Sequence, residues 1–144
     1  MGSSTLQTKS VARLVTELVE AWNAHDPERV AALYAQAYEG MDVGEASPQR
    51  GPQAVRQMVA RYLGAFPDLE FTEQETVVQG QRVALMWKAH GTHRGSLMNI
   101  PATNRPTELR GMSLLTVEDG RITRETSIWD VAGFLRSIGL LPEL

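Results

Sequence analysis

The sequence predicts an α+β domain in which helices come first, an antiparallel sheet follows and one short helix ends the chain. Apolar residues recur at three- and four-residue steps in segments of the first half. From about residue 69 onward the pattern changes to that of strands, with Gly-containing turns between the runs. Consecutive hairpins pair antiparallel strands and cannot supply the long crossovers of a parallel sheet, so we expect the sheet to be antiparallel.

Three N-terminal helices have separate signals. The first is expected over about residues 5–24, because one apolar stripe runs along it. Asp26 and Pro27 supply an N-cap and a first-turn proline, and a second, shorter helix is expected to continue through Tyr34. A loop over residues 45–51 leads into the third helix. The two longer stripes consist of Val11, Leu14, Val15, Leu18, Val19 and Trp22, and of Ala54, Val55, Met58, Val59, Tyr62 and Leu63.

The strands are expected to form two hairpins. The turn QGQ at residues 79–81 joins a β-rich run that begins at Leu69 to the run RVALMWKAHGTH. The loop GSLMNIPATNRP then leads to a second pair, TELRGMSLLTV and RITRETSIWD, which the turn EDG joins. The segment VAGFLRSIG is expected to form the final helix.

The composition is that of an ordinary globular protein. The chain has 144 residues, of which 42% are hydrophobic and 22% charged, and its formal net charge is −3. These values predict one domain over residues 1–144 that lacks the basic surface needed for nucleic-acid binding. There is no cysteine and no segment with the ~20 apolar residues of a membrane span, so we expect a cytoplasmic protein that does not enter a membrane. Residues 1–4, MGSS, are typical of a cloning remnant or a disordered end.

Motifs for common cofactors are absent from the sequence. There is no Gly-rich dinucleotide or phosphate-binding loop and no nucleophile elbow. His90 and His93 come nearest to a metal-binding pair, but their odd spacing places them on opposite faces of a strand. We therefore expect no metal site.

Two places offer carboxylates for chemistry, each with an ordinary alternative. Glu108 and Arg110 lie on one face of a strand, where they hold either a substrate oxygen or a surface ion pair, and the ion pair is favoured. Asp42, between Met41 and Val43, is either a general base whose pKa an apolar setting raises or an exposed turn residue.

A third carboxylate, Asp130, lies where the last strand meets the final helix, and two roles fit this position. As an N-cap it would accept a backbone N–H of the helix, and as a cavity carboxylate it would transfer protons. Asp130, Ile128 and Thr126 share one strand face, whereas Trp129, Ser127 and Glu125 share the other. Neither face is uniformly apolar, so both roles stay open.

Several segments, in their order and spacing, carry a resemblance over nearly the whole chain: AWNAHDPERVAALYA, GPQAVRQMV, FPDLEF, GQRVALMWKAHGTHRG, IPATNRPTELRG, VEDGRITRETSIWD and FLRSIGLLP. Together they resemble the SnoaL-like polyketide cyclase family. The resemblance implies the cone-shaped fold of nuclear transport factor 2 and ketosteroid isomerase. In that fold, N-terminal helices close one side of a strongly bent antiparallel sheet around a deep apolar cavity, and a short helix ends the chain.

The resemblance also implies roles for single residues. Relatives of the cyclase type use no metal or cofactor, and an aspartate near the end of the last strand acts as general acid/base, a position that Asp130 matches. His93 matches a position that borders the cavity, and with Asp130 and Asp42 it is an expected catalytic residue. Asp42 stands without the histidine that many relatives have beside it, and Thr126 stands where many have His or Glu. The expected substrate-binding residues are Trp22, Trp87, Trp129, Arg110, Met112 and Thr126.

We therefore expect a homodimeric cyclase that folds a polyketide-like small molecule in its cavity and closes a ring by aldol-type or pericyclic chemistry in natural-product biosynthesis. Two alternatives stay open. One is an epoxide-opening or hydroxylating relative of the same fold. Epoxide-opening relatives have an aspartate two residues after the arginine that Arg110 would match, and Met112 at that position disfavours this alternative. The other is a non-catalytic ligand-binding or dimerisation domain, because a fold fixes a cavity more firmly than a reaction.

Overall fold

The computed structural model describes residues 2–43 and 47–144. Its elements are, in chain order, α1 (Gly2–Asn23), α2 (Pro27–Ala31), β1 (Tyr34–Asp42), β2 (Gln49–Arg50), α3 (Gly51–Ala65), β3 (Glu70–Gln79), β4 (Arg82–Thr92), β5 (Pro106–Glu118), β6 (Arg121–Trp129) and α4 (Val131–Ser137). None of the described helices is both long and apolar enough to cross a membrane. The predicted α+β class, with N-terminal helices and a short terminal helix, is confirmed.

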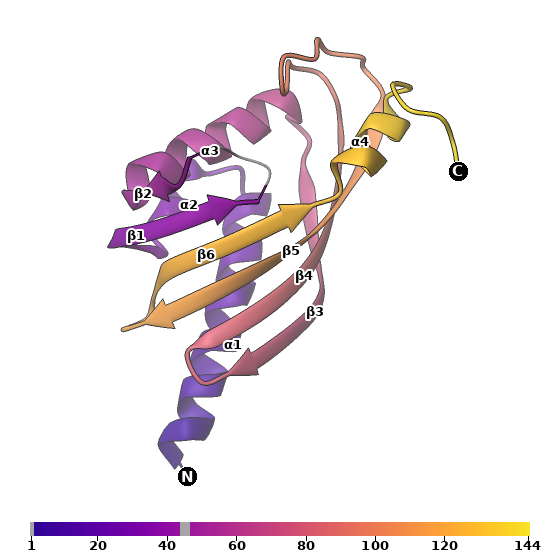
Figure 1. The fold of residues 1–144 in the computed structure, drawn as a ribbon. Helices are drawn as coiled ribbons and strands as arrows, with labels where there is room; N and C mark the ends of the chain where they lie inside the picture. The colour runs from indigo at the N-terminus through magenta and orange to yellow at the C-terminus, as the bar shows by residue number, and fades with distance from the viewer. Residues whose placement is uncertain (1, 44–46) are drawn as a thin grey trace.

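The strands form one curved sheet in the order β2-β1-β6-β5-β4-β3, and α1 and α3 lie together on one of its faces (Figure 1). The helices and the sheet give the cone shape that the resemblance implied, with the sheet left open rather than closed into a barrel. We call the helix-covered side of the sheet the cavity face and the opposite side the outer face.

The expectation of a purely antiparallel sheet is wrong at one pair of strands. Strand β1 runs parallel to β6, whereas the other neighbouring strands pair antiparallel. A parallel pair needs a long connection between its strands, and here that connection consists of α3 and both hairpins, because β1 and β6 lie at opposite ends of the sheet-forming sequence. The hairpin argument therefore holds for β3 to β6 and fails only for β1.

The other differences from the sequence prediction lie near the N-terminal half. Helix α1 begins at Gly2, within the segment set aside as a remnant or disordered end. Helix α2 ends at Ala31, and Tyr34 starts β1 instead of continuing the helix, because the buried Tyr34 and Tyr38 pack as aromatic strand residues in the core. Of the predicted loop, residues 45 and 46 lie outside the described residues, and Gln49–Arg50 form the short strand β2.

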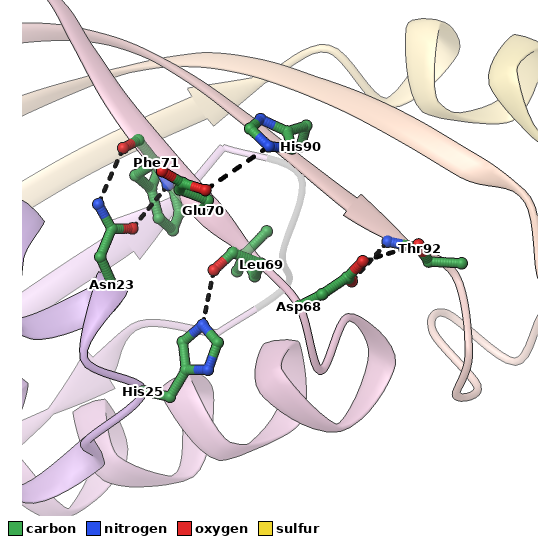
Figure 2. A network of polar contacts seen from close by, with 8 residues as sticks. All are labelled: Asn23, His25, Asp68, Leu69, Glu70, Phe71, His90 and Thr92. Atoms are coloured by element: carbon green, nitrogen blue, oxygen red, sulfur yellow. Dashed lines mark hydrogen bonds and ion pairs between the residues drawn. The ribbon is translucent and has the colours of Figure 1, made fainter.

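Polar contacts fasten the edge strand β3 to the helix layer (Figure 2). The Asn23 side chain donates from Nδ2 to the Phe71 carbonyl at 3.0 Å and accepts the Phe71 N–H at 2.7 Å. His25 Nε2 lies 2.7 Å from the Leu69 carbonyl oxygen. An edge strand leaves backbone groups unpaired, and these side chains provide partners for the groups of Phe71 and for the Leu69 carbonyl just before the strand. They hold Phe71 on the cavity face, against Trp22.

Candidate active site

A cavity of about 100 Å³ lies between the cavity face and the two long helices. Helix α1 contributes Leu18, Val19 and Trp22 to its wall, and α3 contributes Met58 and Tyr62. Leu69, which directly precedes β3, also lines the cavity, and the remaining lining residues come from strands and include Phe71, Leu85, Trp87, Leu109 and Trp129. The wall is therefore mainly apolar and aromatic, which is the usual make-up of a small-molecule site.

Aromatic rings in edge contact form one side of this cavity. The Phe71 ring lies between Trp22, at a centroid distance of 5.0 Å, and Trp87, at 5.3 Å. Tyr62 and Trp129 make a second edge contact at 6.3 Å. Edge-to-face pairs fix ring orientations, so this side presents a firm surface to a flat apolar ligand.

Glu125 is the acidic group at the centre of the polar part of the wall. Tyr34 Oη donates to its Oε1 at 2.9 Å, and Ser127 Oγ donates to its Oε2 at 2.7 Å. Each carboxylate oxygen thus has a hydroxyl partner from the protein. Such an arrangement suits an ionised carboxylate, which can only accept hydrogen bonds.

The hydrogen bonds continue from Ser127 across the sheet. Ser127 Oγ lies 2.9 Å from Ser113 Oγ on β5, and Trp87 Nε1 on β4 donates to Ser113 Oγ at 3.2 Å. The antiparallel register explains these contacts. Ser113 pairs with Ser127 on β6 and with Leu85 on β4. Trp87 lies two residues after Leu85 and therefore on the same face of the sheet. We call the run from Trp87 through Ser113 and Ser127 to Glu125 the hydroxyl chain.

The environment raises the pKa of the Glu125 carboxyl. Burial is the main cause, because a low-dielectric setting disfavours the charged form, and the nearby Asp42 adds to it. The hydrogen bonds from Ser127 and Tyr34 act in the opposite direction but do not cancel the effect of burial. Burial also raises the pKa values of the Tyr34 and Tyr38 hydroxyls, which therefore stay protonated as donors.

Asp42 also lines the cavity, brought there by the parallel pairing of β1 with β6, in which it is the partner of Ser127. It lies on the wall shared with a second, smaller hollow of about 30 Å³. Glu125, Ser127, Met58 and Tyr62 line both hollows as well. The two carboxylates thus come together on neighbouring strands, and a catalytic role for Asp42 stays a prediction.

Asp130 lies elsewhere, so the expectation that it points into the cavity is wrong. It is exposed, and its Oδ1 accepts the Gly133 N–H at 2.9 Å as the N-cap of α4. A side chain on Gly133 would overlap the Asp130 carboxylate, so the glycine makes room for this cap. The capping role explains the position of Asp130.

His93 does not border the cavity either, contrary to expectation. Its ring is fully buried between Phe66 and Phe134, with centroid distances of 5.8 and 5.4 Å. Its Nδ1 accepts the Thr103 N–H at 3.3 Å and lies 3.0 Å from Thr103 Oγ1, and burial lowers the pKa of the imidazole. His93 therefore belongs to the core beneath the loop before β5.

Three expected substrate-binding residues, Arg110, Met112 and Thr126, are on the outer face. Each is exposed and has the strand parity opposite to that of the cavity residues Ser113 and Ser127. Arg110 Nη2 lies 3.1 Å from Glu108 Oε1. The favoured ion-pair interpretation is thus confirmed, and an epoxide-opening site built on Arg110 would lie outside the cavity.

The structure places the other three expected substrate-binding residues, Trp22, Trp87 and Trp129, in the cavity wall. Sequence reasoning missed Glu125, its hydrogen-bond partners Tyr34 and Ser127, and Ser113, which bonds to Ser127. The sequence held one indication that Glu125 faces the cavity, because Glu125 shares a strand face with Trp129, which was expected to bind substrate. Within the described residues no cluster of three or more His, Cys, Asp or Glu could hold a metal ion.

The fold and the site together define a class of small α+β enzymes that enclose a carboxylate in an apolar cavity beneath a bent sheet. The chain belongs to the SnoaL-like polyketide cyclase family, whose model matches residues 12–138, and it is an enzyme of polyketide pathways. It is 30% identical over 128 residues to the aklanonic acid methyl ester cyclase DnrD of Streptomyces peucetius, covering 88% of each chain. It is 29% identical to DauD of Streptomyces sp. strain C5, which has the same activity in its name, covering 88% of this chain and 80% of that one.

Solved structures agree with the fold. TsrD from Streptomyces laurentii superposes with a TM-score of 0.83 at 24% identity, covering 92% of this chain and 97% of that chain. IdmH from Streptomyces antibioticus superposes with a TM-score of 0.78 at 29% identity, covering 90% of this chain and 98% of that chain.

Replacing Asp130 tests its capping role. Asp130→Ala removes the side-chain acceptor at the start of α4 and is expected to lower the free energy of unfolding by about 0.5–2 kcal/mol, whereas Asp130→Asn keeps an acceptor and should lower it less. Urea unfolding of the three proteins measures this. Equal stability of Asp130→Ala and wild type would contradict the capping role.

Proposed function

We propose that this enzyme closes a ring in a polyketide-type intermediate by an aldol-type reaction, with Glu125 as the group that moves the proton. The observation that carries the proposal is the setting of Glu125. It is a carboxylate held by two hydroxyl donors in the wall of a mainly apolar cavity, and burial raises its pKa. A general base is most effective when its pKa lies near the working pH, and this shift is in that direction.

The proposed reaction balances without any group beyond the substrate and the enzyme. The ionised Glu125 takes a proton from a carbon next to a carbonyl group, which leaves an enolate. The enolate carbon then forms a bond to a second carbonyl carbon of the same chain, and that oxygen becomes an alkoxide. The alkoxide takes the proton back from Glu125, so the carboxylate is restored and a cyclic β-hydroxy carbonyl product leaves.

The shape of the cavity can contribute more to the rate than the carboxylate does. Holding two reacting ends of a flexible chain together can lower the barrier by about 7–11 kcal/mol. A single positioned acid/base group typically contributes about 10²–10⁴-fold in rate. The aromatic rings of Trp22, Phe71 and Trp87 are suited to the first task, because they offer a fixed apolar surface against which a chain can fold.

The relatives support this substrate class. DnrD and DauD are named for the cyclisation of aklanonic acid methyl ester. We propose that the present enzyme acts on a related polyketide ester, with the reacting carbonyl groups near Glu125 and the remaining carbon skeleton against the aromatic wall.

Substitution of Glu125 tests its role in turnover. Glu125→Gln keeps the size of the side chain but cannot accept the substrate proton, so kcat/KM should fall by about 10²–10⁴-fold. The measurement follows product formation by liquid chromatography and mass spectrometry with a set of polyketide esters that includes aklanonic acid methyl ester. Glu75→Gln, an exposed change on β3, is the matched control and should leave the rate unchanged. Undiminished turnover by Glu125→Gln would rule out the acid/base role, and failure of the wild-type enzyme to cyclise any ester would contradict the proposed reaction.

The raised pKa of Glu125 also predicts how stability depends on pH. The folded-state pKa lies above the unfolded value of about 4.5, so between these two values the folded protein binds more protons than the unfolded one. The contribution of Glu125 to the free energy of unfolding should therefore decrease as the pH rises through this interval. Glu125→Gln lacks this loss, so its stability relative to wild type should increase as the pH rises above about 4.5. Urea unfolding at several pH values measures the difference, and a decrease with pH would contradict a raised pKa.

We further propose that the enzyme is a homodimer joined through the outer faces of two sheets. Met86, Met112 and Ile128 are neighbours in one row across β4, β5 and β6, and their exposed fractions are 42%, 44% and 54%. Leu114 and Met41 extend this exposed apolar surface. Contiguous apolar patches on a folded chain commonly mark an interface with another protein.

A charge in the middle of this patch tests the dimer. Met112→Glu would bury a carboxylate from each protomer in the interface, so the protein should become a monomer while its fold is kept. Leu140→Glu introduces the same charge at another exposed apolar residue, beyond α4, and should leave the dimer intact. Sedimentation velocity with circular dichroism measures both properties. A wild-type monomer, or a Met112→Glu dimer, would contradict the proposed interface.

A further inference from the structure

We propose that Trp87 is a positioning residue for Glu125, because its indole N–H donates to Ser113 Oγ and so polarises the chain of hydroxyl groups that ends on the Glu125 carboxylate. The catalytic meaning of this inference rests on the proposed function. Its physical content is the coupling between Trp87 and Glu125 through the hydroxyl chain, which can be measured without substrate.

The direction follows from the donors and acceptors along the chain. An indole nitrogen can only donate, so Ser113 Oγ must accept at 3.2 Å from Trp87 Nε1. If Ser113 then donates to Ser127 and Ser127 donates to Glu125, every proton in the chain has an acceptor. In the reverse direction, the Ser113 proton would have no acceptor among the described residues, in a side chain that is buried. Buried polar groups without partners are costly, so the first direction is strongly favoured.

The backbone is arranged to allow this contact. Trp87 pairs with Gly111 on β5, and a Cβ atom on Gly111 would overlap the indole ring. Gly111 in turn pairs with Trp129 on β6, so a glycine lies between two tryptophans in one row of the cavity face. The missing side chain lets the Trp87 ring lie across β5, where its nitrogen reaches Ser113. The requirement at Gly111 is space, because this glycine is not at a positive φ.

Other groups near Glu125 do not depend on this indole nitrogen. The titratable and charged groups that face Glu125 come from β1 and α3, and they are Tyr34, Tyr38, Asp42, Arg61 and Tyr62. The adjacent strand β5 contributes only the uncharged Ser113 and Leu115. Trp87→Phe removes the N–H and keeps an aromatic ring, so it changes the hydroxyl chain and leaves these groups chemically unaltered.

The hydroxyl chain stabilises the ionised form of Glu125, because each donor polarises the next and the last donates to the carboxylate. Shortening the chain should therefore raise the pKa of Glu125, by an amount that declines with distance. Ser127→Ala removes a direct hydrogen bond to the carboxylate and should raise the pKa by about one unit. Ser113→Ala should have a smaller effect, and Trp87→Phe should raise the pKa by a few tenths of a unit.

The measurement is a carboxyl titration by ¹³C NMR of protein labelled at glutamate Cδ, with Glu125→Gln used to assign the signal. The control is Trp22→Phe, the same chemical change at a cavity tryptophan that also contacts Phe71 and whose indole makes no hydrogen bond within the described part of the chain. Gly111→Ala is a second variant that displaces the indole without removing its N–H, and it should raise the pKa as Trp87→Phe does. An equal shift in Trp22→Phe, or none in Trp87→Phe, would overturn the inference.

The indole protons give an independent readout. The chain has three tryptophans, so three indole N–H signals are expected. The signal that Trp87→Phe removes should move with pH at the same midpoint as Glu125 Cδ, and Ser113→Ala should abolish this movement. The Trp22 and Trp129 signals should move less. A flat Trp87 signal in the wild type would also overturn the inference.

Failure of this inference is distinguishable from failure of the proposed function. The titrations need no substrate and report only on the coupling between Trp87 and Glu125. Loss of turnover in Glu125→Gln with no shift in Trp87→Phe would keep the cyclase proposal and remove the role of Trp87. A shift in Trp87→Phe with full turnover in Glu125→Gln would keep the coupling and remove its catalytic meaning.

Discussion

The whole site depends on keeping one carboxylate, Glu125, away from bulk water. An ion in a low-dielectric setting is costly unless hydrogen bonds compensate, and here one hydroxyl from β1 and another from its own strand supply them. Tyr34 and Ser127 can do this only if β1 and β6 are in the observed register. The functional group therefore constrains the sheet, because a slip of one residue would turn Glu125 to the outer face.

The parallel pair of strands is the feature that assembles the site. Hairpins alone would bring together residues from β3 to β6, which supply Trp87, Ser113, Ser127 and Glu125. Strand β1 arrives from the N-terminal half and adds one tyrosine donor and a second carboxylate, Asp42. The like charge of Asp42 reinforces the effect of burial on the pKa of Glu125, so the long-range pairing contributes to the chemistry as well as to the fold.

The sequence was sufficient for the two long helices and both hairpins, but insufficient for β1 and β2 and for the sidedness of the last strand. Helical stripes and Gly-containing turns place α1, α3 and both hairpins, because these signals are local. The parity of β6 correctly separates Glu125 and Trp129 from Thr126 and Ile128. What parity cannot decide is which set points inward. The N-cap at Asp130 illustrates the same limit, since its local role is readable from sequence whereas its distance from the cavity is a tertiary property.

The usual rule that apolar residues point inward fails at this sheet for a physical reason. Ile128 and Met112 lie on the outer face, whereas Ser113, Ser127 and Glu125 lie on the inner one. A site for proton transfer needs polar groups in a protected interior, and a contiguous exposed apolar row commonly marks an interface with another protein. The inversion on β5 and β6 thus links the two proposals, because the alternation that turns a carboxylate inward also turns an apolar surface outward.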